Sequence, residues 1–130
     1  MGQAIQRKQA TVLVVEDEPL IQMMTADALD DAGFAVLEAW NADEALRVLE
    51  KRGHEVQLML TDVNMPGSID GLALADRVHA RWPEILILVT SGQVRPCADE
   101  LPAKGRFLPK PYRTAAMLDQ INDLMHAGHA

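Results

Sequence analysis

The sequence is short of several residue types, and each shortage excludes a class of protein. Its 130 residues include one cysteine, so no disulfide can form within the chain and a reducing compartment is expected. No apolar run approaches the roughly 20 residues that a membrane-spanning helix needs. Residues 1–10 lack the apolar stretch of a signal peptide. We therefore expect a cytoplasmic protein that does not contact a membrane.

Positive charge is also scarce. Twelve Lys and Arg stand against nineteen Asp and Glu, so the formal net charge is −7, and the basic residues are scattered along the chain. Proteins that bind nucleic acid need a basic face for the phosphate backbone. Direct binding of nucleic acid is therefore not expected. Cys97 has no neighbour in the sequence that would activate its thiol, and we assign it no role.

What the sequence does contain is enough apolar residues for one core. Hydrophobic residues make up 48% of the chain, and the length fits a single domain. Apolar, β-branched runs alternate with helical patterns, which is typical of βαβ units and a parallel sheet. We expect one domain over residues 11–126, with a flexible tail at residues 1–10 and a short tail at residues 127–130.

Five segments have the character of β-strands. The first, third and fourth of them are almost entirely apolar, which predicts strands inside the sheet that are covered on both faces. The expected strands are residues 11–15, 35–38, 56–61, 85–89 and 105–108.

The intervening segments predict helices, and several carry end signals. Pro19 fits a first helical turn, and Gly33 fits the position just after a helix. Asn41 is an expected N-cap with Glu44 three residues on, and Asp70 is another expected N-cap. The residues expected to face the core are Ile21, Met24, Ala28 and Ala32 in the first helix, Ala45, Leu46 and Leu49 in the second, Leu72, Ala75 and Val78 in the third, and Met117, Leu118, Ile121 and Leu124 in a last helix over residues 114–125.

The segment between the fourth and fifth strands has little periodicity. It contains Pro96 and Pro102, which interrupt a helix. We expect at most one or two helical turns, over residues 97–101. The fourth helix of the alternating pattern is therefore expected to be short or degraded.

Chemically useful side chains follow four of the strands. The run LMLTD ends on Asp62, the first strand runs into the acidic residues 16–18, the fourth into Thr90, and the fifth into Lys110. In an open parallel sheet the carboxyl ends of the strands meet at one edge, and ligands bind there. We therefore expect these side chains to share one pocket.

The residue types in this pocket suit a phosphoryl acceptor. Clustered carboxylates repel one another unless a cation neutralises them, and Mg²⁺ (or Mn²⁺) binds such oxygen-rich sites. A carboxylate that attacks phosphorus needs a metal, a cation and a neutral donor around the phosphoryl oxygens, and Mg²⁺, Lys110 and Thr90 could supply them. Residues 16–18 alone would fit a solvated acidic turn equally well, but their combination with Asp62, Thr90 and Lys110 favours a site.

Four motifs carry a resemblance to a known family. They are VVEDEP at residues 14–19, TDVNMPG at 61–67, VTSG at 89–92 and LPKPY at 108–112. In this order and spacing the chain resembles the receiver domain of bacterial two-component response regulators, over residues 11–125. Each motif alone is modest, whereas the four together are highly specific.

The resemblance implies a fold and a set of partners. The fold is a doubly wound, flavodoxin-like α/β domain with a five-stranded parallel sheet of order 2-1-3-4-5. The implied donor is a histidine kinase or a histidine phosphotransfer protein, and the implied target is a downstream protein. Such a domain is a signalling module of a phosphorelay that catalyses only its own phosphorylation and dephosphorylation.

The resemblance also implies roles for single residues. Asp62 would accept the phosphoryl group, with Mg²⁺ bound by Asp17, Asp62 and the backbone carbonyl of Asn64. Glu16 would act on the metal through a water molecule. The remaining implied roles are a switch hydroxyl for Thr90, a phosphate-binding ammonium for Lys110 and a moving aromatic ring for Phe107.

Two departures from the family pattern limit what carries over. The loop at residues 67–71 is one residue longer than the commonest form, and the fourth helix is degraded. That helix, the fifth strand and the last helix usually form the output face, so the resemblance allows a homodimer but assigns neither its interface nor the target. Residues 126–130 follow the last helix, and the chain fits either a stand-alone regulator or a receiver from a larger protein such as a hybrid kinase.

Three other functions share parts of this pattern. A haloacid-dehalogenase-type phosphatase also uses a strand-end Asp, but it needs a second Asp where this chain has Asn64, and there is no room for a cap domain. A flavodoxin-like electron carrier would need a phosphate loop rich in Ser, Thr and Gly after the first strand, and no such loop follows it in this sequence. A receiver-like binding module that signals without phosphorylation is disfavoured by intact Asp62, Thr90 and Lys110.

Overall fold

The structure is a computed structural model, and it describes residues 10–65, 67, 69–92, 96, 100–102 and 105–129. Residues 127–129 are described by their backbone alone. Strands and helices alternate through most of the chain, as the sequence pattern predicts. The elements in order are β1 (Thr11–Val15), α1 (Pro19–Asp31), β2 (Ala35–Ala39), α2 (Ala42–Arg52), a short 3₁₀ helix η1 (Gly53–Glu55), β3 (Val56–Asp62), α3 (Gly71–Arg81), β4 (Leu86–Ser91), β5 (Arg106–Pro109) and α4 (Thr114–His129).

The five strands form one parallel sheet in the order β2-β1-β3-β4-β5, which confirms the expected topology. The paired residues along β1 and β3 include Val15 opposite Thr61, so β3 extends one residue beyond the end of β1, to Asp62. Between β3 and β4, Asp62 lies opposite Thr90. The register therefore brings the polar ends of three strands to the same edge.

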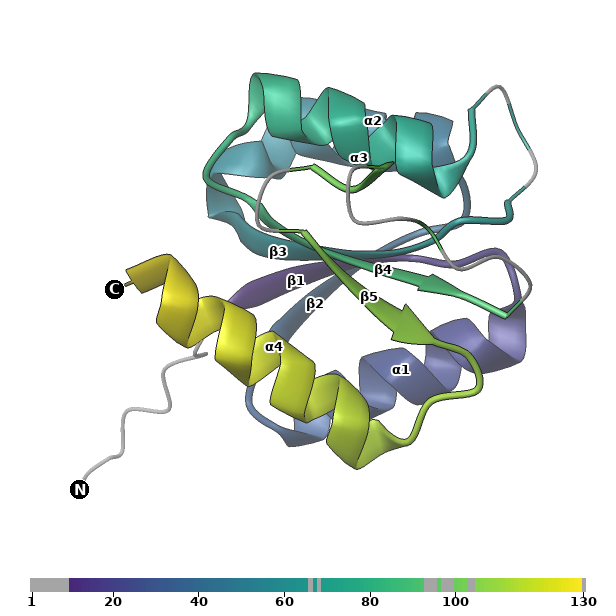
Figure 1. Cartoon of the computed structure of the whole chain (residues 1–130), viewed down its shortest axis with the longest axis vertical. Coiled ribbons are helices and arrows are strands. Elements are labelled where there is room, and N and C mark those ends of the chain that lie inside the picture. Colours follow the sequence, from purple (N-terminus) through teal and green to yellow (C-terminus); the bar gives the residue numbers. More distant parts are fainter. Residues whose placement is uncertain are drawn as a thin grey trace.

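The helices cover the sheet in two layers. Figure 1 shows α2 and α3 on one face, and α1 and α4 on the other. Each layer encloses its own apolar cluster, one built around Leu13, Leu49 and Met59, the other around Leu29, Leu58 and Ile121. β1, β3 and β4 are buried on both faces, as their apolar sequences predict.

The predicted helix caps of α2 and α3 are confirmed. The Asn41 side chain accepts a hydrogen bond from the Glu44 N–H at 2.8 Å, and the Glu44 carboxylate accepts one from the Trp40 N–H at 2.6 Å. This reciprocal pair satisfies one backbone donor of the first helical turn and one just before the helix. Asp70 caps α3 in the same way, accepting from the Ala73 N–H at 2.9 Å.

The predicted inward face of α1 is only partly right. Ile21, Met24, Ala28 and Ala32 were expected in the core. The structure buries Gln22, Thr25, Ala26 and Leu29 instead, leaves Met24 61% exposed, and half-buries the other three, of which Ala28 and Ala32 pack against the core. Apolar residues surround the start of this helix, so periodicity alone could not identify the buried side. Backbone groups at the strand ends need polar hydrogen-bond partners from α1, and this requirement decides which side of α1 faces the core.

Element ends differ from the expected ones by a few residues. β4 ends at Ser91 instead of residue 89, and the last helix continues to His129 instead of ending at residue 125. The expected turns at residues 97–101 fall partly outside the described residues, Cys97 included. Of that segment, Glu100 and Leu101 are described, and neither is α-helical. The label α4 therefore belongs to the last helix.

Candidate functional site

Three carboxylates meet at the carboxyl edge of the sheet. Glu16 directly follows β1, its N–H donates to the Ala39 carbonyl at 3.1 Å, and it is 4% exposed. Asp62 is the last residue of β3 and is 6% exposed. Carboxylate oxygens of Glu16, Asp17 and Asp62 all lie within 4.8 Å of one another. The acid cluster expected from the sequence is therefore present.

Lys110 brings a positive charge to this cluster. Its Nζ lies 2.8 Å from Glu16 Oε1 and 3.2 Å from Asp62 Oδ2, while its backbone N–H donates to the Ser91 carbonyl at 3.0 Å. One ammonium against three carboxylates leaves the cluster short of positive charge. The arrangement favours a further cation, and carboxylate oxygens are the donors that Mg²⁺ prefers.

Burial and pairing act in opposite directions on the charges of this cluster. Burial raises the pKa of Glu16, against the pull of its hydrogen bond from Lys110. Burial lowers the pKa of Lys110, but the bonds and charges of Glu16 and Asp62 outweigh this, and the pKa of Lys110 is raised. The ammonium therefore stays protonated at neutral pH, whereas the ionised form of Glu16 is disfavoured without further positive charge.

The loop after β3 orients the Asp62 carboxylate. The backbone N–H of Asn64 donates to Asp62 Oδ1 at 3.3 Å, and the Asn64 side chain donates to Ser91 Oγ at 3.3 Å. One Asp62 oxygen thus faces the loop and the other faces Lys110. The metal role of the Asn64 carbonyl stays a prediction, and Pro66 of the same motif lies outside the described residues.

Thr90 and Phe107 occupy neighbouring strands beside Asp62. Thr90 is 2% exposed, and its carbonyl accepts a hydrogen bond from the Val63 N–H at 2.8 Å. Phe107 pairs with Val89 along β5, one step before the pair of Thr90 with Leu108. Its half-buried ring packs against the α2 and α3 side of the core. The two residues are therefore diagonal neighbours on two paired strands, and their switch roles stay predictions.

Sequence reasoning missed Gln22. Its side-chain N–H₂ group donates to the carbonyls of Val14, Glu16 and Ala39 at 3.3, 3.4 and 3.0 Å, and the residue is 1% exposed. Through these hydrogen bonds α1 holds the ends of β1 and β2, including the backbone of Glu16. A polar residue amid the apolar residues of α1 was the available signal, but a surface position explains such a residue equally well.

Gly71 was also missed. It begins α3 beneath the β3 end, and a Cβ added there would overlap the carbonyl oxygen of Asp62. Its N–H donates to the Val63 carbonyl at 2.9 Å. Only glycine permits this close approach, so the residue sets where Asp62 lies relative to α3. The site is thus defined by backbone contacts as well as by its charged groups.

The comparisons with known proteins agree with this geometry. The family model described as the response regulator receiver domain matches residues 12–122. The sensor kinase CckA of Brucella abortus (strain 2308) is 35% identical over 119 residues, which are 89% of this chain and 12% of that protein. The chain thus spans about an eighth of the length of this relative.

Two solved structures have a similar fold. The receiver domain of the hybrid histidine kinase CckA superposes with a TM-score of 0.78 at 29% identity, covering 88% of this chain and 98% of that one. A response regulator receiver protein from Sinorhizobium medicae WSM419 reaches a TM-score of 0.85 at 24% identity, covering 92% and 96%. The second likeness concerns the fold alone. Within the described residues, no helix has the length and apolar character needed to cross a bilayer.

Proposed function

The chain belongs to the response regulator receiver domain family, and we propose that Asp62 is the residue that takes up a phosphoryl group. A receiver is a signalling module of two-component systems and not an enzyme. One observation carries the proposal. Asp62 ends a central strand at the sheet edge, buried beside two other carboxylates and the Lys110 ammonium.

The groups around Asp62 orient its carboxylate to accept a phosphoryl group. Its two oxygens have separate partners, the Asn64 N–H and the Lys110 ammonium, which hold the carboxylate in one orientation. In the proposed step an Asp62 oxygen bonds to phosphorus while the P–N bond of a phosphohistidine breaks. The phosphoryl group moves to Asp62 as an acyl phosphate and the donor's histidine is released. Receiver domains partner with histidine kinases, and we assign a histidine kinase or histidine phosphotransfer protein as the donor.

Lys110 and Thr90 hold the group after transfer. The raised pKa of Lys110, which the two acids cause against the effect of burial, keeps its ammonium charged for a phosphoryl oxygen. Thr90 lies opposite Asp62 on β4 and offers a neutral hydroxyl to another oxygen. Charge and hydrogen bonding together replace the water that surrounds the group in solution.

The donor set fits a divalent cation. Glu16, Asp17 and Asp62 form an acidic cluster typical of a receiver Mg²⁺ site, and we assign Asp17, Asp62 and the Asn64 carbonyl as ligands, with Glu16 acting through water. When bound, Mg²⁺ offsets negative charge on the phosphoryl oxygens. Mn²⁺ has the same preference for oxygen ligands and would serve as a substitute.

The output is a shift between two arrangements of the surface near β4 and β5. A phosphoryl group that binds Thr90 draws its hydroxyl inward, and Phe107 on the neighbouring strand then has room to move. Such a shift requires the group to favour one arrangement over the other. We propose that the changed surface is read by a downstream protein.

Acetyl phosphate with Mg²⁺, followed by intact mass measurement, tests the acceptor. We expect a gain of one phosphoryl group in the wild type and none in Asp62→Ala. Glu18→Ala is the matched control, because Glu18 lies in the loop after β1 beside Glu16 and Asp17 but is exposed. Full labelling of Asp62→Ala would exclude Asp62 as the acceptor, and an unlabelled wild type would favour a binding module that signals without phosphorylation.

The metal ligands are tested by melting with and without Mg²⁺. A ligand that binds the folded state alone stabilises it by mass action. We expect the wild type to melt at a higher temperature with millimolar-scale Mg²⁺, and Asp17→Asn to lose most of that increase. Asp27→Asn, an exposed acid on α1, should keep it. A full increase in Asp17→Asn would show that the ligands are assigned wrongly.

A further inference from the structure

A pair of hydroxyl groups joins α1 to the loop that follows β5. Tyr112 Oη lies 2.9 Å from Thr25 Oγ1, across 87 positions of sequence. Thr25 is 4% exposed, so its hydroxyl has little access to water. Tyr112 is the chain's single tyrosine and stands two residues after Lys110. The bond therefore ties the loop that carries the ammonium to α1.

The segment from Lys110 to Tyr112 is held at three points. The Lys110 backbone N–H bonds to Ser91 of β4, its Nζ bonds to Glu16 and Asp62, and the phenol bonds to Thr25. Pro111 restricts the backbone between them. Because the segment is this short, displacement of the phenol is transmitted to the residue that carries the ammonium.

The phenol also lies within the electric field of the charged cluster. Burial raises the pKa of Tyr112, its bond to Thr25 lowers it, and the charges of Glu16, Lys110 and Asp62 act on it as well. Tyr112 therefore lies within electrostatic reach of the cluster.

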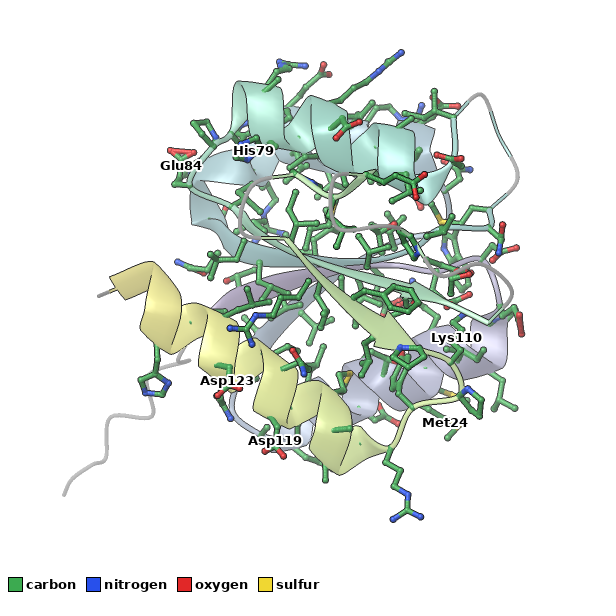
Figure 2. All side chains as sticks on the ribbon, in the orientation of Figure 1. Met24, His79, Glu84, Lys110, Asp119 and Asp123 are labelled. Atoms are coloured by element: carbon green, nitrogen blue, oxygen red, sulfur yellow. The ribbon has the colours of Figure 1, made fainter. Side chains whose placement is uncertain are left out.

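Packing holds this segment on one side only, where the half-buried Tyr112 ring lies against the core layer of α1 and α4. A cavity of about 360 Å³ lies along it, between α1 and the loop, lined by Lys110, Pro111 and Tyr112 on one side and by Ile21, Met24 and Thr25 on the other. Figure 2 shows Lys110 just beyond the end of β5, on the same side of the molecule as Met24, with His79 and Glu84 at the opposite end. A loop beside open space can shift more easily than one in a close-packed interior. The hydroxyl pair adds a directional restraint to the packing of the Tyr112 ring.

We propose that Tyr112 is a positioning residue for phosphoryl transfer, whose hydrogen bond to Thr25 holds the Lys110 ammonium in place beside Asp62. This inference rests on the proposed function. The phenol forms and breaks no covalent bond and does not touch the phosphoryl group. Its effect passes entirely through the position of Lys110.

The first test measures the rate of Asp62 labelling by acetyl phosphate in variants of the pair. Tyr112→Phe removes the hydroxyl and keeps the ring, and Thr25→Val removes the partner hydroxyl at nearly constant shape. We expect each to slow labelling about three- to tenfold, the range that corresponds to the net worth of one hydrogen bond. The double variant should be no slower than either single one, and Thr25→Ser should recover most of the rate lost in Thr25→Val. An unchanged rate in Tyr112→Phe overturns the proposal.

The second test separates positioning from a loss of stability. Ile121→Val on α4 is the control, because it trims the same core layer without touching the loop. In protein without metal or phosphate, we expect the side-chain NMR signals of Lys110 to move in Tyr112→Phe and Thr25→Val and to stay in place in Ile121→Val. Slower labelling with unmoved Lys110 signals would assign Tyr112 a merely structural role and overturn the inference.

The same NMR measurement distinguishes this inference from the proposed function. If the wild type takes no phosphoryl group, the acceptor assignment fails, but the contact between Tyr112 and the position of Lys110 is still measured. Moved Lys110 signals would then uphold that contact, and unmoved signals would refute it.

Discussion

Helices α1 and α2 cover opposite faces of the same sheet, and they differ in how they begin and in which residues they bury. α2 has a side-chain cap at Asn41, acidic residues in its first turn, basic residues in its last, and a buried face of Ala42, Ala45 and Leu49. α1 has no side-chain cap hydrogen bond at Glu18, buries Gln22 and Thr25, and exposes Leu20, Met23 and Met24.

The difference reflects the structural role of each helix. α2 is stabilised by its own end signals and by apolar burial, so its sequence and its structure agree. α1 uses its buried polar residues to hold the ends of β1 and β2 and the loop after β5. The inward face of α1 is therefore set in part by the site. Of the residues that periodicity assigns to the core, Met24 lies on the outer side, whereas Ala28 and Ala32 are half-buried against the core.

The largest expected effect comes from the buried face of α2. Leu49→Ala should lower the free energy of unfolding by about 2–5 kcal/mol, because it leaves a cavity in a fully buried position. Urea unfolding measures this, with the exposed Leu20→Ala on α1 as the control. A loss in Leu20→Ala as large as that in Leu49→Ala would contradict the contrast between the two helices.

A smaller loss of stability, with an added loss of function, is expected from the buried face of α1. Gln22→Met keeps the length of the side chain but removes its donors. Three buried carbonyls each lose one hydrogen bond, although the Ala39 carbonyl keeps the one from the Glu16 N–H, and the change should cost about 1–3 kcal/mol. Mg²⁺ affinity, measured by calorimetry, should also fall because the Glu16 backbone loosens. Leu49→Ala should keep that affinity once the fraction of folded protein is taken into account, and equal losses in both would remove the distinction.

The helix ends give a third comparison. Asn41→Ala removes the cap of α2 and should cost about 1 kcal/mol, whereas Glu18→Ala at the start of α1 removes no cap bond and should cost less. Thermal and urea unfolding of both variants would measure this difference. If Glu18→Ala proved the more costly of the two, the two helix starts would have to be reinterpreted.

The smallest effect is expected on the outer face of α1. Met24→Ser replaces an exposed side chain that the sequence pattern assigns to the core, and it should change the free energy of unfolding by less than about 0.5 kcal/mol. Urea unfolding against the wild type is again the measurement. A loss of 2 kcal/mol or more, the range typical of a core position, would restore the original prediction for this face.

Much of the site was predictable because strand ends are visible in sequence. Apolar runs that stop at Glu16, Asp62, Thr90 and Lys110 place these residues at one edge of any parallel α/β sheet, and the structure brings the three charged ones into contact. Gln22 and Gly71 were not predictable in the same way. Each acts on backbone carbonyls of another segment, and a single sequence contains no pattern for such a contact.

The sequence by itself determined the alternation of strands and helices, the order of the site motifs and the caps at Asn41 and Asp70, because these depend on local periodicity and on hydrogen bonds between near neighbours. Only the tertiary structure decided which face of α1 is buried, that Lys110 pairs with both Glu16 and Asp62, and that Tyr112 reaches Thr25. These contacts join residues far apart along the chain. Their geometry depends on how the layers pack around the strand ends, where buried polar groups must find partners.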